Sequence, residues 1–553
     1  MNSSLGAAAG MLPSSSPPVP AIAATVAATV IVFVLARLYY QRRRSDNNNK
    51  SGGRLPPGPR GLPVIGNMHQ MLANKPAVFQ WLHGLLAESS GDIVCVRLGP
   101  VHVFAVSCPE AAREVLRKKD AVFADRPTTF AAESFSVGYR SVSISPFGDQ
   151  WKKMRRVLAN DLLCPATERR FRATREAEAD HLLLRYVHAL CGAAGGVVDV
   201  RHVARHFCGN VIRRLTLGRR HFFFGDSKAG SYGGPGRDEE EHVDALFATL
   251  NYLDAFCVSD YFPALVGLDL DGHERIVKGV MRTLNRLHDP VVEERVEEWR
   301  LLRKAGERRE AADFLDVLAS LDDAAGRPLL SVEEIKAQTI DIMIATVDNP
   351  SNAAEWALAE MMNRPDVMRK AMAELDAVVG RDRPVRESDL GELRYIRACI
   401  REAFRLHPYH PFNPPRVAMA DTTIARYAVP RGSQVILSRV GLGRNPKVWK
   451  DPLEFRPDRH LLDGAGTVSL AEPELRFISF STGRRGCPGL SLGTLITVML
   501  LARLLHGFEW SKPAGVDKVE LRETATSLVL AQPLVLQATP RLPEQLYYAV
   551  EDY

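Results

Sequence analysis

The first hydrophobic segment of the chain differs from every later one in its length and its lack of charge. Residues 19–36 contain no charged residue, and two tyrosines and three arginines follow within residues 39–44. As a helix, this segment would span about 27 Å, close to the roughly 30 Å of a bilayer core. We therefore predict a short lumenal segment at 1–18 and a transmembrane anchor at 19–40, with the arginines and the body in the cytosol.

A cleaved signal peptide is the alternative to an anchor. No basic residue precedes the apolar run, and no clear small-x-small cleavage site separates it from the arginines. A plastid transit peptide would need early arginines, which the segment lacks. The pattern therefore favours an anchor that is retained.

A polar and then proline-rich stretch follows the anchor. Ser45–Gly53 consists mostly of Ser, Asn and Gly, which is typical of a flexible linker. The sequence Pro56-Pro57-Gly58-Pro59 fixes the backbone and removes hydrogen-bond donors, which predicts a stiff, extended hinge. We assign residues 41–63 to this basic linker and hinge, and residues 64–553 to one folded domain.

Helical periodicity dominates the folded domain, and β-type runs are short. Such runs occur at 93–98 and 101–106, near the start of the domain. The stretch 226–241 is charged and rich in glycine, which predicts a surface loop. The expected fold class is mainly α with small β-sheets.

One predicted helix contains an unusual residue for a helix interior. Ser331 and Glu334 have the spacing of a capping box, which predicts a long helix from there to about Met362. Pro350 falls in the middle of this pattern, where a proline kinks a helix and frees a carbonyl group. A second helix is predicted over Tyr395–Leu406.

Charge and cysteine usage exclude several classes of function. Lys and Arg total 71 against 65 Asp and Glu, and the net charge of +6 comes entirely from residues 37–60. The folded domain therefore carries no excess positive charge for binding nucleic acid. The eight cysteines form no CxxC pair, which argues against zinc fingers, Fe–S clusters and redox dithiols and favours reduced thiols. Neither a GxGxxG nor a Walker sequence occurs, so no nucleotide or flavin site is expected.

A turn near the C-terminus carries the strongest chemical signal. In residues 480–489 a single cysteine, Cys487, is flanked by three glycines and two arginines and precedes an apolar helical run at 490–505. Turn amides and a helix N-terminus surround the sulfur with positive potential, which lowers a thiol pKa and favours the thiolate. Glycines let a flat ligand approach closely. These features suit haem iron; a buried structural cysteine is the alternative.

The same turn identifies a family. Phe480, Gly483, Arg485, Cys487 and Gly489 match FxxGxRxCxG, and on these residues the chain resembles the cytochrome P-450 monooxygenases. The resemblance implies a single large haem-thiolate fold, with haem b bound axially through the Cys487 thiolate. All five residues are then expected at the cofactor.

Three further motifs of the family occur in the expected order. Glu402 and Arg405 match ExxR, and Arg459 lies in a segment that resembles FxPxRF and completes an ion network with them. Trp151 and Arg155 match WxxxR, which contacts a haem propionate in the family. Taken singly, ExxR and WxxxR are commonplace on solvated helix faces.

The resemblance also implies an electron donor. The chain has no flavin domain, so NADPH must act through a separate reductase in the same membrane. Cations that could dock such a partner are Lys152, Lys153, Arg155, Arg156 and Arg484.

The oxygen-activating motif departs from the family's usual A/G-G-x-D/E-T-T/S. The acid is present as Asp348, but Asn349 replaces the usual hydroxyl residue and Pro350 follows it. This combination resembles the plant amino-acid N-hydroxylases, which convert an amino acid to its aldoxime. Stretches 145–156 and 201–206 are similar to the grass members that act on L-tyrosine or L-phenylalanine. Asp348 and Asn349 are therefore the expected catalytic residues.

Two arginines bear on ligand binding. Arg416 stands where that subfamily usually has histidine, whereas ordinary plant members of the wider family have arginine there. Binding of a haem propionate by Arg416 is therefore expected. Arg140 lies in a substrate-lining loop of the family just before Trp151, and we predict that it or a neighbouring cation binds the substrate carboxylate.

The expected activity is NADPH- and O2-dependent N-hydroxylation of L-tyrosine or L-phenylalanine to its aldoxime, for plant defence metabolism. The expected location is the endoplasmic reticulum membrane, with one transmembrane pass and a cytosolic catalytic domain in contact with lipid. A haem-thiolate isomerase or dehydratase, a C-hydroxylase of another small plant metabolite and a non-enzymatic haem redox protein or gas sensor are the alternatives. The sequence selects neither the amino acid nor the pathway that uses the aldoxime.

Overall fold

The computed structural model describes residues 53–89, 92–193, 195–219, 222–223, 234–461, 466–524 and 527–548. The predicted lumenal segment, the anchor and most of the linker lie outside these residues. Within them, helices predominate and β-sheets are small, as the sequence predicts.

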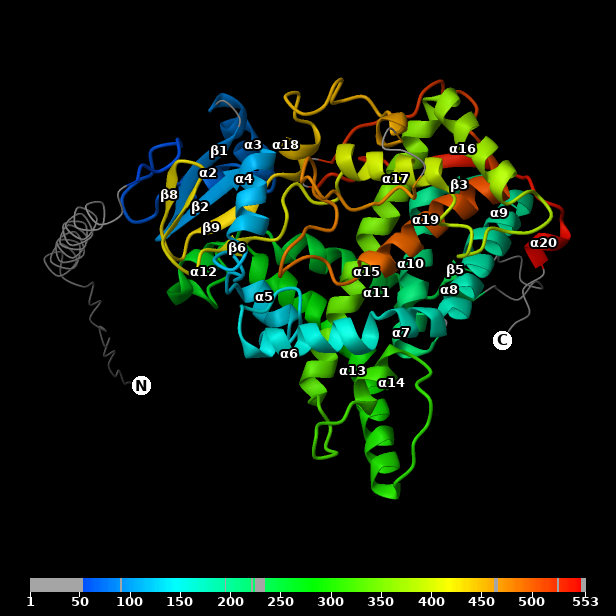
Figure 1. The fold of residues 1–553 in the computed structure, drawn as a ribbon, viewed down its shortest axis with the longest axis horizontal. Coiled ribbons are helices and arrows are strands. Elements are labelled where there is room, and N and C mark those ends of the chain that lie inside the picture. The colour runs from blue at the N-terminus through cyan, green and yellow to red at the C-terminus, as the bar shows by residue number, and fades with distance from the viewer. Residues whose placement is uncertain are drawn as a thin grey trace, which may run out of the picture.

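A mixed β-sheet lies at one end of the molecule, and helices make up most of the rest (Figure 1). Its strand order is β1-β2-β9-β6, in which β1 and β2 are antiparallel, β2 and β9 are parallel, and β9 and β6 are antiparallel. The strands are β1 (Ile93–Leu98), β2 (Val101–Val106), β6 (Arg416–Val417) and β9 (Gln434–Leu437). Both predicted β-type runs are therefore strands, and β6 brings Arg416 into the sheet.

Smaller strands pair elsewhere in the fold. One sheet has the order β10-β11-β3, and two hairpin-like pairs join β4 to β5 and β7 to β8. Their bounds are β3 (Val197–Asp199), β4 (Phe222–Phe223), β5 (Gly234–Pro235), β7 (Thr422–Ile424), β8 (Tyr427–Val429), β10 (Phe508–Ser511) and β11 (Val535–Pro540).

The long helix α15 (Val332–Met362) is buried along most of its length at the centre of the helical part. The predicted capping box is present: the Ser331 hydroxyl accepts from Glu334 N at 3.2 Å, and Glu334 Oε2 accepts from Ser331 N at 2.8 Å. Pro350 lies inside the helix, so the predicted extent and the internal proline are both confirmed. The helices packed against it include α10 (Val200–Leu217), α11 (Arg237–Leu253), α13 (His273–Ala305), α17 (Arg394–Leu406) and α19 (Leu490–Gly507).

The remaining helices surround this core. They are α2 (Met68–Ala73), α3 (Val78–Glu88), α4 (Pro109–Arg113), α5 (Phe130–Phe135), α6 (Asp149–Val157), α7 (Pro165–Arg170), α8 (Arg172–Ala179), α9 (Val187–Ala193), α12 (Val258–Tyr261), α14 (Phe314–Ser320), α16 (Pro365–Val378), α18 (Arg439–Gly443) and α20 (Gln545–Tyr548). Short π-helical or 3-10 turns are η1 (Glu114–Lys118), η2 (Leu158–Leu162), η3 (Asp180–Tyr186), η5 (Pro263–Leu265) and η6 (Pro457–His460).

One sequence expectation needs correction. The stretch 226–241 was predicted to be a loop throughout, but α11 begins at Arg237 and takes in its last residues. Asp238, Glu239 and Glu240 occupy the first turn of that helix, where carboxylates interact favourably with the helix dipole. The acidic run therefore begins a helix instead of ending a loop.

Within the described part of the chain, α19 alone is long and apolar enough to cross a membrane. However, 72% of this segment is buried inside the protein. Its apolar sequence is accounted for by packing against α15, α16 and α17.

Candidate functional site

The turn that carries Cys487 is held by its own backbone and by a neighbouring helix. Cys487 N donates to Phe480 O at 2.9 Å, and Gly486 N donates to Gly483 O at 2.9 Å. Gly483 has a φ of +74°, and a Cβ there would lie 2.5 Å from Leu116 O. Only glycine fits that position, because it needs both a left-handed backbone and close contact. The turn is thus fixed just before α19 begins.

Cys487 is surrounded by protein, yet its side chain is accessible because it lines a cavity. Burial raises the pKa of the Cys487 thiol, while the Gly489 backbone N–H and the charges of Arg155 and Arg439 lower it. The turn therefore lowers the thiol pKa in the predicted direction, but burial outweighs it and the net shift is upward. A thiolate at this position needs a directly bonded cation, which haem iron would supply.

The cavity separates the Cys487 turn from one face of α15. Ala345, Thr346, Asn349 and Pro350 line it from the helix. Ala345 is exposed although its helix neighbours are buried, because it faces this space. A slot between a cysteine turn and a helix suits a flat ligand whose metal is bound by sulfur.

Positive charge is buried beside the cavity with little to balance it. Arg416 is 1% exposed, its Nε has no hydrogen-bond partner among the described residues, and burial, Arg126 and Arg485 hold its pKa well below the usual range. The Trp151 indole Nε1 is also buried, and no acceptor in the described part of the chain contacts it. The pKa of Arg485 falls to about 9, first through burial and then through Arg126. Two carboxylates of a bound haem would match these donors and charges, so the residues present fit the cofactor.

Other hydrogen-bond donors beside the cavity are paired with backbone carbonyls. Arg485 donates to the carbonyls of Ala124 and Ser145, both at 2.7 Å, and its guanidinium lies 4.6 Å from the centre of the Trp151 ring. Arg155 Nη1 donates to Gly486 O at 2.9 Å, which ties α6 to the Cys487 turn. The structure therefore brings the predicted Trp151, Arg155, Arg416 and Arg485 together around one cavity.

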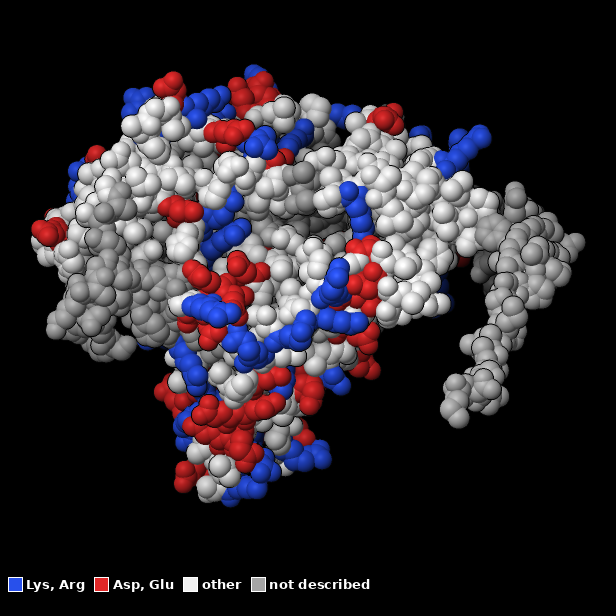
Figure 2. All heavy atoms as spheres, turned by 180° about the vertical axis from the view of Figure 1, so that it is seen from behind, with Lys and Arg blue, Asp and Glu red and all other residues white. Residues whose placement is uncertain are grey.

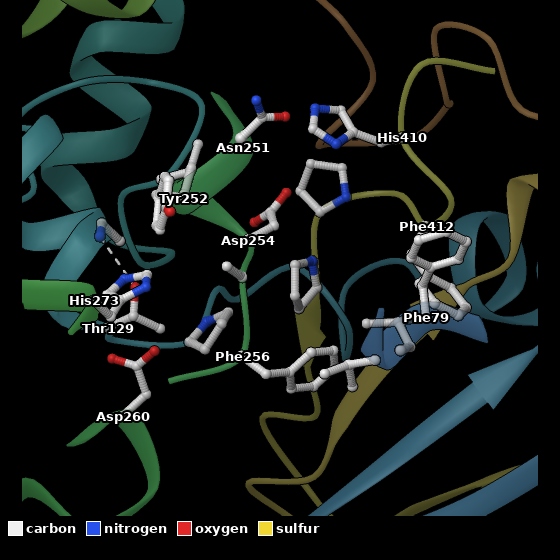
Figure 3. Close-up of a pocket in the computed structure, with 18 of the residues that line it drawn as sticks. Phe79, Thr129, Asn251, Tyr252, Asp254, Phe256, Asp260, His273, His410 and Phe412 are labelled. Carbon is white, nitrogen blue, oxygen red and sulfur yellow. Dashed lines mark hydrogen bonds between the residues drawn. The ribbon is translucent and has the colours of Figure 1, made fainter. Parts of the chain in front are cut away.

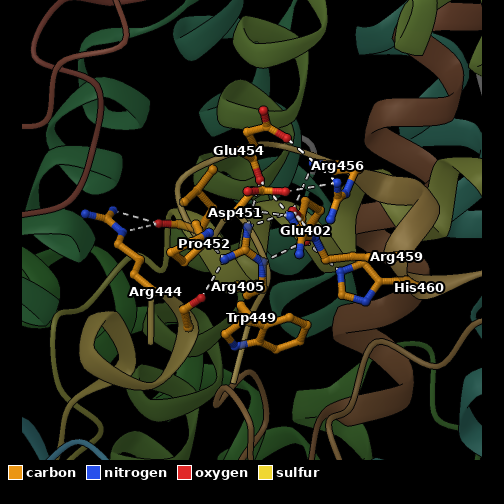
Figure 4. A network of polar contacts seen from close by, with 12 residues as sticks. Glu402, Arg405, Arg444, Trp449, Asp451, Pro452, Glu454, Arg456, Arg459 and His460 are labelled. Atoms are coloured by element: carbon orange, nitrogen blue, oxygen red, sulfur yellow. Dashed lines mark hydrogen bonds and ion pairs between the residues drawn. The ribbon is translucent and has the colours of Figure 1, made fainter. Parts of the chain in front are cut away.

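A buried ion network lies behind the cysteine turn (Figure 4). Glu402 accepts from Arg405 Nη2 at 2.7 Å and from Arg459 Nε at 3.0 Å, as the sequence predicts. His460, in a segment of the same motif, adds a contact of 2.7 Å to the other carboxylate oxygen. Burial opposes ionisation of Glu402, but Arg405 and His460 outweigh it and lower its pKa to about 2.

The network also fixes the backbone around it. Arg405 is completely buried and donates to three carbonyl groups, those of Gly443, Pro452 and Glu454. The segment that precedes the Cys487 turn is thereby tied to α17. Sequence reasoning missed His460 as a member, although it stands at the position of the motif's final aromatic residue.

The two expected catalytic residues of α15 face different ways. Asn349 lines the cavity, whereas Asp348 is absent from its lining and is completely buried. Burial raises the pKa of Asp348 strongly, and Arg205 of α10 and the Tyr409 hydroxyl lower it. Asp348 therefore lies on the α10 side of the helix.

The structure does not bring Arg140 to the cavity. Its guanidinium donates to Val137 O, and it contributes to lowering the pKa of Glu333 on the surface. Of the expected docking cations, Lys153 is bound by Glu334 at 2.8 Å and Arg484 by Asp120 at 2.7 Å. The other two surface cations, Lys152 and Arg156, are exposed on α6.

A second cavity of about 570 Å³ adjoins the first and was not expected from the sequence (Figure 3). Its lining combines aromatic residues with isolated polar ones, among them Phe79, Phe412, Asp254 and His410. These residues come from three separate parts of the chain, so no local motif could reveal them.

Comparison with known proteins agrees with this geometry. The chain matches the family described as Cytochrome P450 over residues 56–537. It is 60% identical over 499 residues to a tyrosine N-monooxygenase of Sorghum bicolor, which covers 90% of this chain and 88% of the relative. It is 50% identical to a phenylalanine N-monooxygenase of Prunus mume (89% and 92% covered) and 49% identical to tryptophan N-monooxygenase 1 of Arabidopsis thaliana (90% of each).

Removing the negative charge of the ion network should destabilise the protein strongly. In Glu402→Gln, Arg405 keeps its charge in a fully buried position without a counter-ion, so we expect a loss of about 3–5 kcal/mol. Urea denaturation, monitored through the haem absorbance, measures this change. Glu297→Gln removes an exposed partner of Arg300 and serves as the matched control, with little change expected. Equal midpoints for Glu402→Gln and the wild type would contradict a stabilising role.

Proposed function

The chain belongs to the cytochrome P450 family, and on that basis we propose that it converts an aromatic L-amino acid, L-tyrosine first, to its aldoxime. The chain is a haem-thiolate amino-acid N-monooxygenase. The finer choice of substrate is supported by the 60% identity to a tyrosine N-monooxygenase. The observation that carries the proposal is Asn349-Pro350 at the position on α15 that borders the cysteine cavity.

The residues that would hold haem are those around the slot. Cys487 would bind the iron, and Trp151, Arg155 and Arg416 would face the propionates. Phe480, Gly483, Arg485 and Gly489 shape the turn or its surroundings; a Cβ at Gly489 would lie 3.9 Å from the Cys487 sulfur. Haem held by a thiolate supplies the activation of O2 for insertion of one oxygen atom into a substrate.

Asn349 and Pro350 distinguish the chemistry of this cavity. The Asn349 amide can donate a hydrogen bond into the cavity, but it passes on a proton less readily than a hydroxyl. Pro350 has no N–H, so the carbonyl of Thr346 loses its helical donor beside the cavity. That carbonyl is an acceptor for water, which can supply protons in place of a threonine hydroxyl. Asp348 would act through Arg205 and Tyr409 and without direct contact with the substrate.

An amine substrate suits such a site. Once its ammonium group has lost a proton, its nitrogen carries its own lone pair and further protons, which reduces the need for a hydroxyl relay. Each of two N-hydroxylations consumes O2 and NADPH and releases water; loss of a further water and of carbon dioxide then leaves the aldoxime. Consumption of about two NADPH per product is the expected balance.

Electrons must arrive from another protein under this proposal, since the sequence carries no flavin or nucleotide motif. The exposed cations Lys152 and Arg156 lie on α6, which Arg155 joins to the Cys487 turn. We assign to this face the docking of a membrane-bound NADPH reductase with an acidic surface.

Membrane attachment is proposed through residues 19–40, with the endoplasmic reticulum as the location. The surface near the start of the described chain supports contact with lipid: charged side chains gather on the protrusion formed by α13, and uncharged atoms dominate toward the sheet (Figure 2). Large apolar side chains are exposed there at Leu62, Val64, Ile65, Leu72, Val266, Leu268 and Leu270.

An assay with a panel of amino acids tests the function. The full-length holoenzyme, with purified reductase and NADPH, should convert L-tyrosine or L-phenylalanine to an oxime, identified by mass spectrometry. Consumption of a fatty hydroperoxide without NADPH would instead establish an isomerase or dehydratase. Hydroxylation at carbon, with the amine intact, would establish the C-hydroxylase alternative.

Replacing Asn349 with threonine, which restores the family's usual hydroxyl, should lower the amount of oxime formed per NADPH consumed. We expect Asn349→Thr to bind haem and amino acid but to yield several-fold less oxime per NADPH, with the difference appearing as hydrogen peroxide. Parallel assays of NADPH, peroxide and oxime measure the ratio. Asn285→Thr, an exposed position on α13, is the control and should couple like the wild type. Equal coupling in Asn349→Thr would mean that the amide has no part in proton supply.

Deleting residues 1–53 should remove the predicted anchor and leave the folded domain unaffected. The first described contacts of the body begin after this segment, with Ala428 N donating to Arg54 O at 3.1 Å. We therefore expect the truncated protein to retain haem, which its ferrous–carbon monoxide spectrum reports, and to wash from membranes at high salt more readily than the full chain. Loss of haem on truncation would show that the domain boundary is wrong.

A further inference from the structure

The second cavity and the cysteine cavity form one continuous ligand-binding region. Both are lined by Arg126, Leu250, Leu253 and Asp254, and by part of the segment 410–414. Apolar and aromatic residues dominate the walls of the second cavity, with Phe256 and Phe412 prominent in Figure 3. Asp254 therefore lies on the wall that the two cavities share.

Asp254 is a carboxylate without a contact partner. It follows the last residue of α11 and is half-buried. Among the described residues, no hydrogen bond and no ion pair within 4.0 Å joins its side chain to another group. Figure 3 shows it near the middle of the lining, with no hydrogen bond to the residues drawn around it. Burial raises its pKa, and the more distant charges of Arg126 and Arg439 lower it.

Two cations act on Asp254 from beyond contact distance, Arg439 and Arg126. Arg439 lines the cysteine cavity, and its buried Nε has no hydrogen-bond partner among the described residues. Arg126 Nη1 donates to Pro414 O at 2.6 Å and to Pro415 O at 2.7 Å, and its Nε donates to Ser143 O at 3.2 Å. Arg126 is thus committed to the backbone of two loops. His410 borders the same space, but burial lowers its pKa to about 3, so it carries no charge at neutral pH. Among the described residues, no cation is therefore in hydrogen-bond or ion-pair contact with this half-buried carboxylate.

We propose that Asp254 binds the α-ammonium group of the amino-acid substrate and is a specificity-determining residue of this enzyme. The inference rests on the proposed function, since an amino acid brings a primary ammonium into a region lined by Asp254 and aromatic side chains. A charge-assisted hydrogen bond to a desolvated carboxylate is strong. It also selects amines over carboxylic acids that lack the amino group, because those acids would leave Asp254 unpaired.

Binding measurements on the full-length holoenzyme test the assignment. Equilibrium dialysis and the substrate-induced change in haem absorbance give the Kd of L-tyrosine and of 3-(4-hydroxyphenyl)propanoate, which lacks only the amino group. In the wild type, L-tyrosine should bind about 10- to 100-fold more tightly than this acid. Asp254→Asn should remove most of that preference, Asp254→Glu should retain part of it, and Asp244→Asn, exposed on α11, should keep it in full.

The outcomes separate the inference from the proposed function. If the wild type binds L-tyrosine no more tightly than the acid, the inference is overturned without any variant. If Asp254→Asn retains the preference, or weakens both ligands equally, Asp254 does not recognise the ammonium group. If the wild type forms oxime yet Asp254→Asn changes nothing, only the inference fails. If the wild type neither binds nor oxidises any amino acid, the proposed function and the inference are both wrong.

Discussion

Positive charge buried beside the cysteine cavity is the constraint on which the rest of the site depends. Burial, Arg126 and Arg485 lower the pKa of Arg416, burial and Arg126 lower that of Arg485, and burial lowers that of Arg126 to about 10. A protein interior accepts such a cluster only when carbonyls and anions offset it. Backbone carbonyls of distant loops accept hydrogen bonds from Arg126 and Arg485, and the carboxylates of haem would balance the charge of Arg416. The Cys487 thiolate likewise needs a positive charge beside it.

Helix α15 determines which side chains face the cavity, and so the specificity of the reaction. Its N-terminus is fixed by the Ser331–Glu334 capping box, and its middle turns Asn349 and Pro350 toward the cavity while Asp348 faces α10. Asn349 therefore lines the cavity, and its neighbour in sequence is buried on the other side of the helix. The similarity to tyrosine, phenylalanine and tryptophan N-monooxygenases agrees with the amino-acid N-hydroxylation expected from Asn349 and Pro350.

Features encoded over a few neighbouring residues could be predicted from the sequence. The capping box, the proline inside α15, the strands β1 and β2 and the pairing of Glu402 with Arg405 each depend on local spacing, and each is confirmed. Properties that depend on distant packing could not be predicted. The pKa of Cys487 follows burial more than turn geometry, and Arg140 donates to the carbonyl of Val137 in its own loop instead of reaching the cavity.

The surroundings of Asp254 also could not be predicted from the sequence. Its cavity is assembled from α5, the end of α11 and the segment before β6, which are separated by more than a hundred residues of chain. A lone aspartate after a helix gives no signal in the sequence, and only the lack of a partner in the fold marks it. Recognition of an ammonium group there, next to a cavity suited to haem, would place the substrate nitrogen near the site of oxidation.

The central claim is that this enzyme oxidises nitrogen. It is tested most directly by turnover of L-tyrosine under isotopically labelled dioxygen, with mass spectrometry of the product. The account predicts that the label appears in the oxime oxygen and that the carboxyl carbon is released as carbon dioxide. A labelled hydroxyl group on carbon, with the amine and the carboxylate both retained, would contradict it.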